Sequence, residues 1–209
     1  MKRHILISIC SVLLFSCKSY HGPVSSKENY VQGTFTVVNP YFATIGEEHI
    51  FRAHIQISKR EVSGLLVVKR MDELVHRVVL TSDFGNTLFD FSIYKDQPYA
   101  INYVMPDLNK KIILNFLAKD FSYLVEDNYT LQAKATQPDT TVYKGVYKKQ
   151  KTFVVVNQQE EVTEVIAASA SKPKIIFTYA KGGETLEITH QNFPLVIRLN
   201  PLEPSLTED

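Results

Sequence analysis

The chain has 209 residues, of which 44% are hydrophobic, and its formal net charge is +1 at pH 7. This length and apolar content suit one globular domain with its own core. A charge so close to neutral gives no electrostatic reason to expect nucleic acid as a partner. Both cysteines, Cys10 and Cys17, lie near the amino terminus, so the rest of the chain has no thiol for a disulfide, a zinc site or a nucleophile.

The first residues have the pattern of an export signal. Lys2 and Arg3 precede an apolar run from Ile5 to Phe15 that is too short to span a bilayer, and small Ser16 precedes Cys17. The order Leu14-Phe15-Ser16-Cys17 resembles a bacterial lipoprotein signal. This resemblance implies a signal peptide over residues 1–16, cleavage before Cys17 and acylation of Cys17. The alternative is ordinary secretion with a free Cys17.

Polar residues follow Cys17, and Gly22 and Pro23 interrupt them, which predicts a flexible lipidated tether over residues 17–29. We expect the folded domain to cover residues 30–200. The acidic, proline-containing end of the chain, residues 201–209, is predicted to be disordered.

Short runs with apolar residues at every second position fill most of the domain. Such alternation is typical of strands with one buried face. About a dozen successive strands with short turns favour a mainly β fold, either an antiparallel barrel or a sandwich. Adjacent glycines in Lys181-Gly182-Gly183-Glu184 predict a hairpin turn. The predicted strands are residues 34–38, 51–57, 64–70, 76–81, 89–93, 99–104, 129–135, 142–148, 152–156, 162–167, 175–179, 186–190 and 195–199.

One segment breaks this pattern. Apolar residues from Leu108 to Leu124 recur at helical spacing after a start signal at Pro106 and Asp107, which predicts one amphipathic helix. The helix either plugs the open side of a curved sheet or forms a lid over an apolar cavity. Periodicity does not distinguish the two arrangements.

Two segments resemble the LolA/LolB family of the lipoprotein-localisation pathway. They are Ser63-Gly64-Leu65-Leu66-Val67-Val68-Lys69 and Leu80-Thr81-Ser82-Asp83-Phe84-Gly85-Asn86-Thr87-Leu88-Phe89-Asp90-Phe91. The resemblance implies an incomplete antiparallel β-barrel with a helical lid over an acyl-chain cavity. The lipoprotein signal favours LolB, the outer-membrane receptor, and the chain is also similar to lipoproteins of Bacteroidetes.

The resemblance assigns a membrane-transfer loop to Asp83, Phe84 and Gly85, with Phe84 as the protruding apolar residue. Asp83 replaces the proline of the family pattern. The alternative is a Phe84 that folds back and seals the barrel end. The residues expected to line the lipid cavity are Phe51, Ile55, Leu66, Val68, Phe89, Phe91, Ile93, Ile112, Phe116, Leu117 and Phe121.

The sequence contains no motif of a catalytic site, a metal site or a cofactor site, so we do not expect an enzyme. The resemblance implies reception of the acyl chains of lipoproteins from a LolA-type periplasmic carrier, at the periplasmic face of the outer membrane. The alternative is a binding or scaffold lipoprotein with a filled core. The basic run Lys148, Lys149 and Lys151 solvates a strand end or contacts anionic headgroups.

Overall fold

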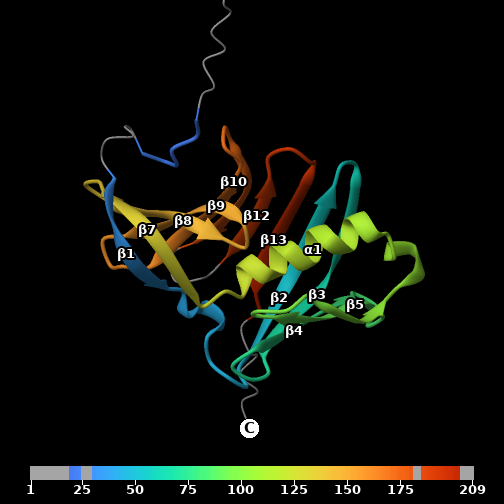
Figure 1. Cartoon of the computed structure of the whole chain (residues 1–209). Helices are drawn as coiled ribbons and strands as arrows, with labels where there is room; N and C mark the ends of the chain where they lie inside the picture. Colours follow the sequence, from blue (N-terminus) through green and yellow to red (C-terminus); the bar gives the residue numbers. More distant parts are fainter. Residues whose placement is uncertain (1–18, 25–29, 181–184, 203–209) are drawn as a thin grey trace, which may run out of the picture.

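The computed structural model describes residues 19–24, 30–180 and 185–202, and Figure 1 shows their arrangement. Thirteen strands and one α-helix make up most of this part of the chain. The predicted signal peptide, Cys17 and the hairpin turn at 181–184 lie outside the described residues. The strands are β1 (Val31–Val38), β2 (Glu48–Ile57), β3 (Arg60–Arg70), β4 (Val75–Ser82), β5 (Thr87–Tyr94), β6 (Ala100–Val104), β7 (Asn128–Thr136), β8 (Thr140–Tyr147), β9 (Gln150–Asn157), β10 (Val162–Ala168), β11 (Pro173–Tyr179), β12 (Leu186–His190) and β13 (Leu195–Pro201).

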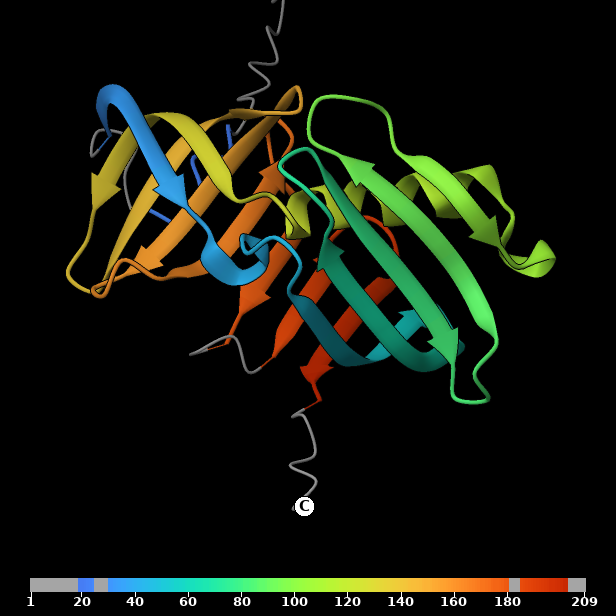
Figure 2. The same ribbon diagram turned by 90° about the horizontal axis from the view of Figure 1, so that it is seen from below.

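All of these strands belong to one antiparallel sheet, in the order β1-β7-β8-β9-β10-β11-β12-β13-β2-β3-β4-β5-β6. The sheet is strongly curved but not closed, because β1 and β6 each have one neighbour (Figure 2). The expected mainly β fold, an incomplete barrel with one helix, is confirmed.

The alternating pattern gives each strand one buried face. In β2, Phe51, Ala53 and Ile55 are buried, whereas Arg52 and His54 point away from the core. The same rule places Phe89 and Phe91 of β5 in the interior, where their rings stack 4.9 Å apart. Large apolar side chains from both halves of the sheet therefore meet on its concave side.

The α-helix, α1 (Lys111–Leu124), connects β6 to β7 across the open side of the sheet (Figure 1). A short 3-10 helix, η3 (Pro106–Leu108), occupies the predicted start, so α1 begins later than the proline signal suggests. The buried apolar residues of α1 are Leu114, Leu117, Ala118, Phe121 and Leu124.

The prediction that Ile112 lies on the buried face of the helix is wrong. Its side chain is 65% exposed, because it lies in the first turn on the side of α1 that faces away from the sheet. Ile112 therefore does not line the interior in this structure. Phe116 is partly buried and stacks on Phe193, with ring centroids 5.2 Å apart.

The segment after the predicted anchor also differs from expectation. Residues 19–24, which we expected to be flexible, pack against the outer face of β9 and β10. The backbone N–H of Tyr20 donates to the carbonyl of Ala170 over 2.8 Å, and the Tyr20 and Phe153 ring centroids lie 5.3 Å apart. Phe153 belongs to a second, smaller apolar cluster on this face. We call residues 19–24 the strap.

Gly22 explains why the strap fits. It has a φ of +88°, and a Cβ atom at this position would lie 2.5 Å from the ring of Phe153. Only glycine combines this backbone conformation with such a close approach. The hydroxyl of Tyr30 donates to the carbonyl of His21 over 2.9 Å and fixes the next peptide unit.

Replacing Gly22 with alanine should therefore release the strap. We expect a stability loss of about 1–2 kcal/mol, from the left-handed conformation alone, and faster proteolysis before residue 24. Gly46→Ala is the matched control, because Gly46 has a φ of +84° but no atom within 4 Å of its Cβ position. Equal protease resistance of the two variants would contradict the docked strap.

Candidate functional site

The loop between β4 and β5, residues 83–86, presents Phe84 to solvent. The Phe84 side chain is 91% exposed, the highest value among the exposed large hydrophobic residues described. Gly85 has a φ of +80° and donates its N–H to the carbonyl of Ser82 over 2.9 Å, which closes a tight turn. The structure therefore places Phe84 at the loop tip and not folded into the barrel end.

Asp83 holds this loop to the neighbouring strands. Its carboxylate accepts hydrogen bonds from the guanidinium of Arg52 on β2 and, over 2.7 Å, from the hydroxyl of Ser63 on β3. Both partners belong to the outward face of the sheet. These bonds restrict the motion of the loop, as the proline of the family pattern would do. The sequence did not predict either partner of Asp83.

Gly64 allows β3 and β4 to approach closely at the base of the 83–86 loop. A Cβ atom on Gly64 would lie 1.8 Å from the carbonyl oxygen of Thr81, so β3 and β4 approach where only glycine fits. An open groove of about 670 Å³ lies beside this region and is lined by Arg52, Ser63, Leu65 and other residues of the outward face. It does not lead into the concave side, because these residues alternate with the buried ones.

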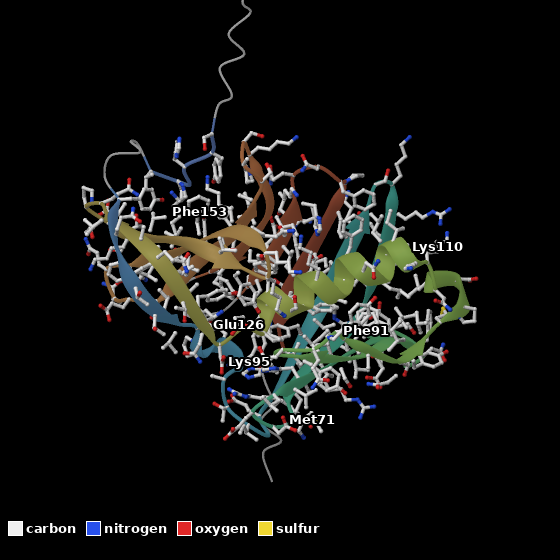
Figure 3. All side chains as sticks on the ribbon, viewed as in Figure 1. Met71, Phe91, Lys95, Lys110, Glu126 and Phe153 are labelled. Carbon is white, nitrogen blue, oxygen red and sulfur yellow. The ribbon has the colours of Figure 1, made fainter. Side chains whose placement is uncertain are left out.

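Side chains fill the concave side. Nine of the residues expected to line a lipid cavity are buried in the main core, with Ile112 and Phe116 as the exceptions. Phe121 of α1 lies 5.6 Å from Phe89 and 6.3 Å from Phe91, between ring centroids. Figure 3 shows Phe91 on the strands beside α1. No preformed acyl-sized cavity is therefore present among these residues.

Two smaller spaces lie along α1. A space of about 20 Å³, bounded in part by Arg70, His76 and Glu126, has room for about one water. A groove of about 290 Å³ follows the seam between α1 and the β5–β6 connection, where Ile93, Tyr99 and Ala118 form part of its wall. Along this seam the contact between α1 and the sheet is open at the surface.

Polar bonds cross the interface of α1. The hydroxyl of Tyr99 donates to Oδ1 of Asn115 over 2.8 Å at the seam. On the other side, His190 of β12 bonds Oδ2 of Asp120 at 2.8 Å. Asp120 is fully buried, and its Oδ1 has no hydrogen-bond partner in the described part of the chain. An apolar pair would avoid this desolvation, so Asp120 is an imperfect contact for a permanently packed helix.

Sequence reasoning missed the Asp120–His190 pair. The available signal was the position of Asp120, three residues after Leu117 and four before Leu124, within the apolar stripe of the predicted helix. A charged residue at such a position requires a buried partner. The sequence offered no means of choosing His190 among the histidines, because the pairing depends on the sheet order.

Burial raises the pKa of the Asp120 carboxyl, although His190 partly offsets this effect. A raised native pKa gives stability that is present below the unfolded value of about 3.9 and is lost as pH rises through the native pKa. The melting temperature of Asp120→Asn relative to wild type should therefore increase as pH rises from acid to neutral. Asp139→Asn, in the exposed β7–β8 turn, is the control for loss of a carboxylate, and a parallel trend in both variants would contradict the assignment.

Within residues 19–24, 30–180 and 185–202, no group of three or more histidine, cysteine or acidic side chains is arranged to hold a metal ion. In the same residues, no helix is long and apolar enough to cross a membrane.

No protein-family model and no curated protein match the sequence. A DUF1329 family protein from Desulfovibrio piger, known from its crystal structure, superposes with a TM-score of 0.46 at 7% sequence identity. The superposition covers 75% of this chain and 84% of that chain.

Proposed function

We propose that this protein is an outer-membrane lipoprotein that receives the acyl chains of other lipoproteins and passes them to the membrane. In this proposal a LolA-type periplasmic carrier delivers the cargo, and the acyl chain of the cargo enters between α1 and the concave face of the sheet. The 83–86 loop then contacts the bilayer. Transfer requires no catalytic residue, because the cargo moves between two apolar environments.

The exposed Phe84 is the observation that carries the proposal. A large aromatic side chain that the domain leaves uncovered has a reason to be there if an apolar surface outside the domain covers it. The bonds of Asp83 to Arg52 and Ser63 keep the loop in place, so Phe84 does not need to become ordered before it inserts. Burial of one phenylalanine contributes about 1.5–3 kcal/mol, which orients a tethered protein but does not anchor it.

Cargo entry requires α1 to move, because side chains fill the concave side. The groove along Tyr99 and Asn115 and the unbonded Oδ1 of Asp120 are the features of the α1 interface that favour its separation from the sheet. Burial of a palmitoyl chain yields about 12 kcal/mol, at about 0.8 kcal/mol per methylene. The carrier and the bilayer bury the same chain, so only the difference in affinity between these environments is available to offset the lost contacts of α1.

A titration with a palmitoylated lipopeptide tests the proposal. The chain from Lys18 onward retains every described contact and lacks the predicted leader. We expect saturable binding of the lipopeptide and none of the same peptide without its acyl chains. Hydrogen exchange should also show that the amides of α1 change protection on binding. Equal signals for the acylated and unacylated peptides would contradict the proposal.

The packed core supports a second candidate, a binding or scaffold lipoprotein of the same fold. Tyr123 and Phe177 stack 5.5 Å apart, and Tyr129 is fully buried with its hydroxyl bonded to the carbonyl of Tyr123 over 2.8 Å. A core with such contacts needs no ligand to be complete. This candidate forecasts no change at α1 in the titration.

The proposed anchor gives a separate prediction. Cys17→Ala should abolish incorporation of a clickable fatty acid and release the protein from the membrane fraction. The melting temperature of the domain should not change, because the described fold begins after Cys17. Cys10→Ala is the matched control and should retain the label. Labelling that persists in Cys17→Ala would show that the anchor is elsewhere.

A further inference from the structure

Three hairpin turns lie side by side at one end of the molecule (Figure 1). They are the β2–β3 turn, the β12–β13 turn and the β10–β11 turn. The N–H of Ser58 donates to the carbonyl of Pro194 over 2.7 Å, and the N–H of Gln191 donates to the carbonyl of Lys174 over 2.8 Å. We call residues 58–60, 169–174 and 191–194 the turn face.

The strap joins this face to the start of the chain. Tyr20 is bonded to Ala170, which lies in the β10–β11 turn. Because a residue spans at most about 3.6 Å, a membrane attachment at Cys17 would lie within about 11 Å of Tyr20. The turn face is therefore the part of the domain that a short, docked strap brings to a membrane surface.

Cations dominate the turn face. Lys59, Arg60 and Lys172 are exposed, and Lys174 is partly exposed. The three turns themselves contain no carboxylate, and the nearest one along the chain is the exposed Glu61, directly after Arg60. Among the described residues, none of these four cations forms a salt bridge. Lys119 of α1 adds a further positive charge near Lys174. Burial and the charge of Lys174 both lower the pKa of Lys119.

Carboxylates gather at the opposite strand ends. Asp72 and Glu73 occupy the β3–β4 turn, Glu160 and Glu161 the β9–β10 turn, and Glu47 and Glu48 the start of β2. Lys69 pairs with Glu48 at this end over 2.7 Å, so the excess negative charge comes from the two turns, and the net charge near zero conceals a separation of charge along the strands. Such a separation orients a protein at a charged surface even when its net charge does not attract it.

From this charge distribution we infer that the turn face binds the anionic headgroups of a phospholipid bilayer. Lys59, Arg60, Lys172 and Lys174 face the headgroups, and the neutral β12–β13 turn lies between them. The Lys148–Lys149 turn is not part of this surface, because Lys148 lies near the carboxylates of Glu126 and Asp96. The inference does not require the cargo function or Phe84.

Vesicle binding by the chain from Lys18 onward tests the inference. The chain should bind vesicles of phosphatidylcholine with phosphatidylglycerol at low salt, and binding should fall steeply as the salt concentration rises. Each cation near such a surface strengthens binding about fivefold, the equivalent of about 1 kcal/mol. Lys59→Gln/Arg60→Gln should therefore weaken binding roughly 25-fold, and adding Lys172→Gln should bring the loss to roughly a hundredfold.

A matched double variant tests whether the position of the charges, and not their total number, determines binding. Lys134→Gln/Lys149→Gln removes two positive charges outside the turn face and should leave affinity within about twofold of wild type. Thermal unfolding of each variant verifies the fold. Equal losses in the two double variants, equal binding to pure phosphatidylcholine vesicles, or no vesicle binding by wild type would each overturn the inference. Phe84→Glu should bind with the same salt dependence as wild type even where loss of the inserted ring lowers its affinity, which distinguishes this surface from the transfer loop.

Discussion

Replacing Phe84 with glutamate should reduce the transfer of an acylated cargo to liposomes at least about tenfold. A carboxylate in place of the ring opposes insertion into the bilayer, at a cost of a few kcal/mol. The melting temperature should hardly change, because substitution at a position that is 91% exposed alters stability by about 0.5 kcal/mol or less. A liposome transfer assay and thermal unfolding, run on the same preparations, measure both effects.

Val146→Glu is the control for this variant. Val146 on β8 is 61% exposed and lies outside the 83–86 loop, so the same charge is introduced into an unrelated surface. Transfer by Val146→Glu should match that of wild type. If both variants lose transfer, or if neither does, Phe84 has no special role in the handover.

Phe121→Ala should lower the free energy of unfolding by about 3–5 kcal/mol. The Phe121 ring is fully buried between α1 and β5, where it meets Phe89 and Phe91. Its removal leaves a cavity that the curved sheet and the helix are poorly able to close. Chemical denaturation at neutral pH measures the loss.

Phe84→Ala deletes the same group from an exposed position and should change stability by about 0.5 kcal/mol or less. The comparison separates packing from any general effect of losing an aromatic residue. A loss below about 1 kcal/mol in Phe121→Ala would mean that α1 is not packed on the sheet as described.

The strands could be predicted because one buried face imposes a strict period of two. In β2 the pattern from Phe51 to Ile57 identified both the strand and its buried side. The start of α1 was less predictable, because Pro106 begins a 3-10 helix as readily as an α-helix, and its periodicity did not reveal that Ile112 faces solvent.

The candidate site depended on contacts between residues that are far apart in the sequence. The position of Phe84 between Asp83 and Gly85 indicated a turn, but the partners of Asp83 follow from the pairing of β2, β3 and β4. The strap shows the same limit. Gly22 and Pro23 suggested flexibility, whereas Gly22 is required because Phe153, far along the chain, leaves no room for a side chain.

Native mass spectrometry of the chain from Lys18 onward, mixed with a palmitoylated lipopeptide, tests most directly whether acyl chains enter the domain. The proposed function predicts a one-to-one complex that survives desolvation and is absent with the unacylated peptide. If only the mass of the free protein is observed at every lipopeptide concentration, the result would contradict the proposed function and favour the filled-core scaffold.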